Sequence, residues 1–247
     1  MKNRVFFTVV ALLVASSVFA GTLNVVSSFL SRKYWRKGLE YAGGYLYTTS
    51  NYTDNTIHVY STAGSLVRTI RTLASSMGVE VSNAPKGHIW VCTYSSLVVL
   101  MTTTGSVVTS FSGPAAGYGI TSGGGYLYFS SARSGNYVWQ LTTAGSIVRS
   151  FRGPGSFNGG LDWVNGYLWL ADWPAAGGRL YYMTTTGSVI DSFPTPGAQR
   201  PAGCTWDGNY VWYHHYTMAE TGWCFRAKAI FSSVAPASLG KIKSIYR

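Results

Sequence analysis

An eleven-residue motif occurs four times in this sequence and constrains the fold more than any other feature. The copies read MTTTGSVVTSF at 101–111, LTTAGSIVRSF at 141–151 and MTTTGSVIDSF at 183–193, with a more divergent copy, YSTAGSLVRTI, at 60–70. The glycine of TTTGS or TTAGS suits a hairpin loop that needs a residue in the left-handed conformation. The residues on either side of the loop alternate between two faces, which is typical of strands. We therefore expect each copy to form the end of one strand, a three-residue turn with a bulge, and a second strand.

Two further motifs recur upstream of each turn. One reads GYLY at 44–47, GHIW at 87–90, GYLY at 125–128, GYLW at 166–169 and GNYVW at 208–212. The other reads GLEY at 38–41, GVEV at 78–81, GITS at 119–122, GLDW at 160–163 and GCTW at 203–206. The turn glycines Gly64, Gly105, Gly145 and Gly187 are spaced 41, 40 and 42 residues apart. Four short strands in a unit of about 41 residues indicate a β-propeller blade, so the sequence predicts an all-β, five-bladed β-propeller of four-stranded antiparallel blades.

One strand is left over at the front of the chain. Residues 21–29, GTLNVVSSF, look like the outer strand of a blade that is otherwise missing, whereas the fifth unit has no matching strand after Cys224. The favoured prediction is that the N-terminal strand completes the last blade, because ring closure removes free sheet edges. The alternative uses Lys241–Ile245 as the closing strand.

The repeats resemble those of the short-repeat β-propellers of the NHL-like and YVTN-like kind. The resemblance rests on G-[YH]-[LI]-[YW], followed about twenty residues later by T-x-G-S-[VIL]-[VI], and it extends over nearly all of the chain after residue 20. It implies the propeller architecture. It implies no single activity, because that group includes lyases, lactonases, cyclotransferases, lectins and scaffolds.

The chain begins with MKNRVFFTVVALLVASSVFA, which has a basic start, a short apolar run and small residues at its end. This layout predicts a signal peptide over 1–20, cut before Gly21, and hence a secreted, periplasmic or cell-surface protein without a membrane span in the mature chain. The propeller is predicted over 21–234. The basic segment 235–247 is predicted to be a tail or closing strand.

Charge and cysteine content narrow the function classes. The net charge of +11 favours anionic partners such as acidic polysaccharide or phospholipid heads, but the absence of a block of five like charges argues against nucleic acid. Cys92, Cys204 and Cys224 form neither a CxxC metal motif nor a disulfide framework. We expect a monomer.

The connections between blades, together with those between the second and third strands, differ from one repeat to the next and share one face of a propeller. We call this end of the ring the loop face. Its candidate ligand-binding residues, which combine aromatic rings with charged or imidazole groups, are Tyr34, Trp35, Tyr52, Tyr118, Phe157, Asp172, Trp173, Arg200 and His214. Such side chains can stack on sugar rings or hold an anionic group. Alternatively, the aromatic residues only cover the ends of the blades.

The third residue of the innermost strand motif carries a side-chain oxygen in every unit. These residues are Glu40, Glu80, Thr121, Asp162 and Thr205. Because this strand lines the central channel, Glu40, Glu80 and Asp162 are candidate ligands of a hard cation such as Ca²⁺, or of a water cluster. In the alternative interpretation, each of these side chains accepts a hydrogen bond from the neighbouring blade.

These features together predict an exported, non-catalytic propeller that binds a protein or glycan at the cell surface through its loop face. Two alternatives remain: a lectin-like propeller that binds carbohydrate, and a lyase or hydrolase that uses a cation held by Glu40, Glu80 and Asp162. The chain contains neither G-x-S-x-G nor HExxH, the short signatures of two common hydrolase classes.

Overall fold

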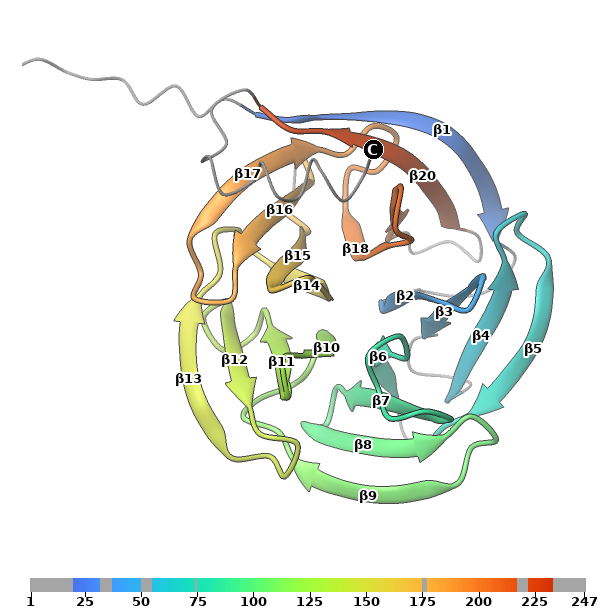
Figure 1. The fold of residues 1–247 in the computed structure, drawn as a ribbon, viewed down its shortest axis with the longest axis vertical. Helices are drawn as coiled ribbons and strands as arrows, with labels where there is room; N and C mark the ends of the chain where they lie inside the picture. The colour runs from blue at the N-terminus through green and yellow to red at the C-terminus, as the bar shows by residue number, and fades with distance from the viewer. Residues whose placement is uncertain are drawn as a thin grey trace, which may run out of the picture.

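Twenty β-strands form five four-stranded antiparallel sheets in the computed structural model, and the sheets are arranged as the blades of a ring (Figure 1). The structure describes residues 20–31, 37–49, 55–73, 75–174, 177–216 and 222–232. The predicted five-bladed propeller is confirmed. No helix is present among the residues described, and hence none that could cross a membrane.

Each blade runs from an inner strand at the channel to an outer strand at the rim. Blade 1 contains β2 (Leu39–Ala42), β3 (Tyr45–Thr49), β4 (Thr56–Ser61) and β5 (Leu66–Arg71). Blade 2 contains β6 (Ser76–Glu80), β7 (His88–Thr93), β8 (Leu97–Thr102) and β9 (Val107–Ser112). Blade 3 contains β10 (Gly119–Gly123), β11 (Tyr126–Ser131), β12 (Tyr137–Leu141) and β13 (Ile147–Arg152). Blade 4 contains β14 (Asn158–Val164), β15 (Tyr167–Asp172), β16 (Arg179–Thr184) and β17 (Val189–Pro194).

Blade 5 is built from both ends of the chain. It contains β18 (Pro201–Trp206), β19 (Val211–His215) and β20 (Gly222–Ile230), and its outer strand is β1 (Thr22–Ser31). The antiparallel pairing of β1 with β20 extends from Thr22 opposite Ile230 to Ser31 opposite Gly222. Closure by the N-terminal strand is thus confirmed. The alternative closing strand, 241–245, lies outside the described residues, as do residues 1–19 of the predicted signal peptide and the segment 235–247.

The repeated motif forms the predicted turn. In the copy at 101–111, Gly105 has a φ of 101°, and the backbone N–H of Ser106 donates a hydrogen bond to the Thr102 hydroxyl at 3.0 Å. The strand register shifts between Leu100 and Met101, which is the expected bulge. In the divergent copy, Ser61 replaces the threonine and accepts the same bond from Ser65 at 3.1 Å.

The motif also packs each blade against the next. A side chain at Gly145 would strike the ring of Phe111, the last residue of the preceding copy, and one at Gly187 would strike Phe151. Gly64 is packed in the same way against Phe29 of β1, which shows that the N-terminal strand takes the place of a missing copy. The turn and the final aromatic residue recur together because they form one interface between blades.

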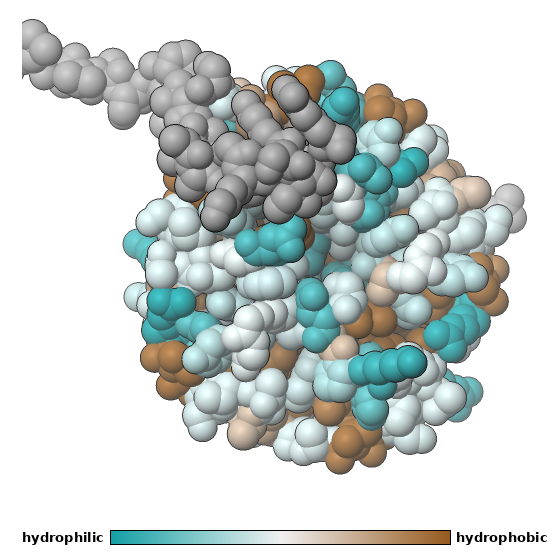
Figure 2. Space-filling view, viewed as in Figure 1, coloured by the Kyte–Doolittle hydropathy of each residue, from teal (hydrophilic) through white to brown (hydrophobic). Residues whose placement is uncertain are grey.

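The hydrophobic core is divided among the five interfaces between adjacent blades. Between blades 1 and 2, for example, Ile57 and Val59 pack with Val79 and Ile89. The outer strands face solvent: Val67, Val108 and Val148 are each about half exposed. Brown, apolar residues accordingly appear at several points around the rim in Figure 2. Cys92, Cys204 and Cys224 are buried and free.

Candidate functional site

The third residue of every inner-strand motif accepts a hydrogen bond from the backbone of the next blade, so these residues link the inner strands into a closed ring. The N–H donors and acceptors are Ser122 to Glu80 Oε2 (2.9 Å), Trp163 to Thr121 Oγ1 (2.9 Å), Trp206 to Asp162 Oδ2 (2.7 Å), Tyr41 to Thr205 Oγ1 (3.0 Å) and Ser82 to Glu40 Oε1 (3.3 Å). The alternative interpretation from the sequence therefore describes a real set of bonds. These bonds between blades involve one carboxylate oxygen of each acid. They do not involve its second carboxylate oxygen.

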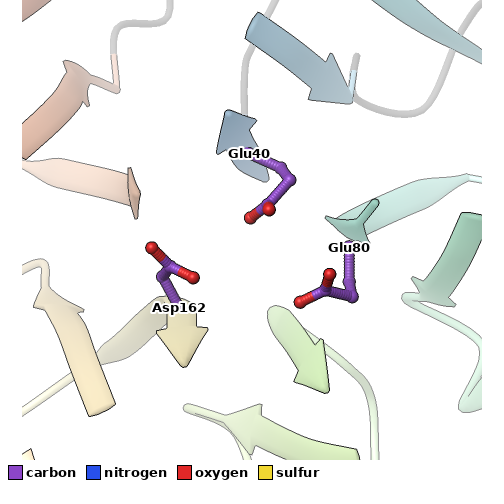
Figure 3. A group of neighbouring side chains, drawn as sticks. All are labelled: Glu40, Glu80 and Asp162. Carbon is purple, nitrogen blue, oxygen red and sulfur yellow. The ribbon is translucent and has the colours of Figure 1, made fainter. Parts of the chain in front are cut away.

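The three acids of this ring face one another in the channel. Figure 3 shows Glu40 on β2, Glu80 on β6 and Asp162 on β14, with their carboxylates pointing into the space between the inner strands. One oxygen of each lies within 4.8 Å of the others, and all three side chains are buried. The sequence prediction that these three residues come together is confirmed by this geometry, whereas their binding of a cation stays a prediction.

The β6–β7 turn lies against the acids on the face opposite the loop face. The N–H of Asn83 donates to Glu80 Oε1 at 2.7 Å, and the Asn83 side-chain amide reaches the Trp163 carbonyl of blade 4 at 3.5 Å. Glu80 also accepts a bond from the Thr121 hydroxyl at 2.6 Å. Glu80 is thus held by donors on both oxygens, which stabilises its ionised form relative to that of Glu40.

Burial shapes the acid–base behaviour of the group. It raises the pKa of Asp162 from 3.8 to about 8, and the charge of Glu80 adds to the effect. Burial likewise raises the pKa of Glu40 well above its ordinary value, with further contributions from Glu80 and Asp162. The pKa of Glu80 is raised by burial and lowered by its hydrogen bonds. Without a cation, Asp162 therefore keeps a proton at neutral pH.

A cluster of aromatic rings lies at the loop-face end of the channel, which we call the channel mouth. Its members come from the ends of inner and second strands of blades 2 to 5: Tyr94, Tyr118, Phe157, Trp173 and Tyr216. Ring centroids are 6.2 Å apart for Tyr94–Tyr118, 5.1 Å for Tyr118–Phe157, 4.6 Å for Phe157–Trp173 and 4.0 Å for Trp173–Tyr216. Tyr94, Phe157 and Trp173 keep part of their surface open to solvent.

Lys37 lies among these rings. Its Nζ is 4.0 Å from the ring centroids of both Trp173 and Tyr216 and 5.4 Å from that of Tyr118. The residue is only 4% exposed, and burial lowers its pKa from 10.5 to about 7. Aromatic faces attract an ammonium group, but they replace only part of the hydration that it loses on burial. The charged form of Lys37 is therefore disfavoured relative to the neutral amine. Lys37 is the central charged group of the channel mouth.

The structure brings some of the predicted loop-face residues together and separates others. Tyr118, Phe157 and Trp173 lie together in the channel mouth. Asp172 is buried next to them and accepts the Phe157 N–H at 2.8 Å, so it supports the Phe157 loop. Arg200 is partly exposed near Tyr216, whose N–H donates to the Arg200 carbonyl at 2.8 Å, while His214 is buried in β19. Tyr34, Trp35 and Tyr52 lie outside the described residues.

Sequence reasoning missed Lys37, Tyr94 and Tyr216. A signal for Lys37 was present, because it immediately precedes the glycine of the inner-strand motif. The corresponding residues in the other units are Met77, Tyr118, Gly159 and Ala202, so Lys37 is the one charged residue at this position. Its burial among rings from blades 3 to 5 depends on ring closure and was not visible in the repeat pattern.

The structural comparisons identify the class of fold. A glutaminyl cyclase from Myxococcus xanthus superposes with a TM-score of 0.69 at 11% identity, over 87% of this chain and 99% of that one. Hydrazine synthase from Kuenenia stuttgartiensis gives a TM-score of 0.52 at 13% identity, over 73% and 56% of the two chains. The WD40 propeller domain of Doa1 gives 0.51 at 17% identity, over 76% and 62%.

These structures include enzymes and a domain of the WD40 type, and identities this low show a shared fold alone. No protein-family model matches the chain, and no curated protein sequence matches it either. The chain is thus a β-propeller, as its repeats indicate. Its kinship with NHL-like and YVTN-like repeats stays a prediction.

Proposed function

We propose that this propeller is an exported binding protein that holds a ligand at the channel mouth without transforming it. The observation that carries the proposal is the aromatic cluster around Lys37, in which the partly open ring of Trp173 and the buried rings of Tyr118 and Tyr216 surround one ammonium group. Partly open aromatic faces stack on the apolar faces of sugar rings, and an ammonium group pairs with a carboxylate or other anion. The ligand class that suits both is an acidic saccharide, such as a glycan of a cell surface.

The charge of the protein supports the same ligand class. Without residues 1–20, which carry Lys2 and Arg4, the net charge is +9 (17 basic residues minus 8 acidic ones), and it attracts polyanions, although that attraction is screened at physiological salt. An anion beside Lys37 would also offset the burial that lowers its pKa to about 7. Binding should consequently take up a proton above pH 7, and affinity for an acidic ligand should fall as pH rises further.

The test is binding of the purified protein to an array of neutral and acidic glycans. We expect binding to acidic saccharides, at least tenfold weaker in Trp173→Ala. Tyr126→Ala is the matched control, because Tyr126 is an exposed aromatic residue that begins β11 at the opposite end of the ring. Equal loss in both variants, or no saccharide binding by the wild type, would refute the proposal. A preference for neutral glycans would still support a carbohydrate-binding propeller, but it would contradict the proposed pairing of Lys37 with an anionic group.

A second candidate function is a lyase or hydrolase, and one observation favours it. Lys37 and Glu40 lie three residues apart on one segment, roughly 10 Å along an extended chain, and both have displaced pKa values. An amine that is partly neutral at pH 7, near carboxyl groups that retain protons, can serve as base and acid. Time-dependent cleavage of a bound glycan, abolished in Lys37→Met but not in Tyr126→Ala, would favour this enzyme over a binding protein.

A further inference from the structure

We propose that the channel holds one hard divalent cation of the calcium type between Glu40, Glu80 and Asp162, independently of any ligand at the channel mouth. Each acid comes from a different inner strand, and one oxygen of each lies within 4.8 Å of the others. Calcium binds oxygens at about 2.3–2.6 Å, so two ligands on opposite sides of one ion are separated by about 5 Å. The spacing of the acids therefore suits a shared ion.

A second observation concerns Glu40 alone. Its side chain is fully buried and points into the channel, and its Oε2 atom has no hydrogen-bond partner (Figure 3). A buried carboxylate oxygen without a donor is costly, and such atoms are rare in folded proteins. The hydrogen bonds between blades do not account for this oxygen, because the Ser82 N–H reaches Oε1 instead. A cation in the channel would supply the missing partner.

The surroundings favour a hard ion. In the described part of the chain, no lysine or arginine forms an ion pair with the three acids. The ion pair found there joins Arg226 and Asp207. The donors at the site are oxygens. Cys204 lies nearby, but burial raises the pKa of its thiol well above the ordinary value, so the thiolate that a soft metal needs is disfavoured. The Ser82 hydroxyl, 3.4 Å from Glu80 Oε1, can rotate away when an ion enters.

The experiment measures the melting temperature of the purified protein in EDTA and after addition of Ca²⁺ or Mg²⁺, together with direct calorimetric titration. At a hundredfold excess over Kd we expect Ca²⁺ to raise the melting temperature by about 5–10 °C. Glu40→Gln keeps an acceptor for Ser82 and should lose the response to Ca²⁺. Without Ca²⁺ it should melt no lower than the wild type, because it no longer buries an acid.

Ser130→Ala provides the matched control. The buried Ser130 hydroxyl also donates a hydrogen bond between blades, to the Gly159 carbonyl, but it does not contact the acids. This variant should melt at a lower temperature and keep the full response to Ca²⁺. The proposal is overturned if Ca²⁺ neither shifts the wild-type melting temperature nor gives binding heat at pH 8. It is also overturned if Glu40→Gln binds Ca²⁺ as tightly as the wild type does.

A different observation supports a second inference: we infer that removal of residues 1–20 creates an N-terminal ammonium group that closes the ring through Asp191. Gly21 is buried, and its backbone nitrogen donates to Asp191 Oδ1 at 2.9 Å. Asp191 Oδ2 accepts the N–H of Ser232 at 2.7 Å, so one buried carboxylate of blade 4 binds the residues that flank the paired ends of β1 and β20 in blade 5. Ala20 is exposed, which places the predicted cleavage at the edge of the buried region.

Hydrolysis of the Ala20–Gly21 bond consumes one water and leaves the Ala20 carboxylate and the Gly21 amine, which takes up a proton. The resulting ammonium group would replace an uncharged amide donor to the Asp191 carboxylate with a charged one and so form an ion pair, and bonds between two charged groups are shorter and stronger. Gly21 has no room for a side chain, because an added Cβ would strike the Phe193 ring. Only glycine fits at this position.

The test compares the protein that begins at Gly21 with the same protein acetylated at Gly21, which removes the charge and keeps the N–H. We expect the free amine to raise the melting temperature by several degrees, and Asp191→Asn to abolish most of that difference. Equal melting temperatures for the free and acetylated forms would overturn the inference, as would an undiminished difference in Asp191→Asn.

Discussion

Raising the pH from 5 to 7 without divalent cations should destabilise this protein, and Asp162 provides the magnitude. Burial raises its pKa from 3.8 to about 8. Across this range the folded protein keeps a proton that the unfolded chain has lost, so the free energy of unfolding falls by about 1.36 kcal/mol per pH unit for each such group. Asp162 alone accounts for a loss of roughly 2–3 kcal/mol, and the raised pKa values of Glu40 and Glu80 act in the same direction.

The pH range matters because Lys37 acts in the opposite direction at higher pH. Burial lowers its pKa to about 7, so the unfolded chain holds the extra proton between pH 7 and 10.5, and stability contributed by this group rises with pH there. Below about pH 6, Lys37 is charged in both states and contributes little slope. Histidines also titrate between pH 5 and pH 7, so the comparison with Asp162→Asn is what isolates the acid.

The assay is urea unfolding in EDTA, followed by tryptophan fluorescence at several pH values. Asp162→Asn serves as the control, because its amide oxygen can still accept the Trp206 N–H but cannot ionise. This variant should lose roughly 2–3 kcal/mol less between pH 5 and pH 7 than the wild type. A wild-type free energy of unfolding that stays level or rises with pH would refute the reasoning, as would an unchanged slope in Asp162→Asn.

Three further predictions concern the turn, the closing strand and the channel mouth. Gly145→Ala should destabilise by about 1–3 kcal/mol in thermal melts, because φ is 91° and Phe111 blocks the new methyl group. Gly124→Ala, with open space at a φ of 61°, should cost less, and equal losses would contradict the packing argument. Phe29→Ala should lower the free energy of unfolding by about 2–4 kcal/mol in urea, since its ring packs near Tyr60 and Trp212, and a loss below 1 kcal/mol would contradict that role. Lys37→Met should stabilise by on the order of 1 kcal/mol at pH 6 and less at pH 9, and a loss of stability at pH 6 would show that the caged ammonium is favourable.

The sequence by itself determined the architecture. Four copies of one turn motif, with glycines about 41 residues apart, required units of four strands, because a glycine with positive φ and a local hydrogen bond specify each hairpin from its own residues. The same periodicity placed Glu40, Glu80 and Asp162 in one register. Symmetry then brings equivalent positions together at the axis of a ring, and for this reason the acid group could be predicted.

Only the tertiary structure decided what surrounds these residues. The buried Glu40 Oε2 without a partner depends on where the β6–β7 turn lies, and the repeat pattern does not specify that turn. The aromatic rings around Lys37 belong to Tyr118, Trp173 and Tyr216, which come from three blades. They lie at positions where the repeats differ from one another. Local sequence specifies strands and turns through short-range bonds. Burial and the pKa values that follow from it depend on groups distant in the chain, and ring closure brings those groups together.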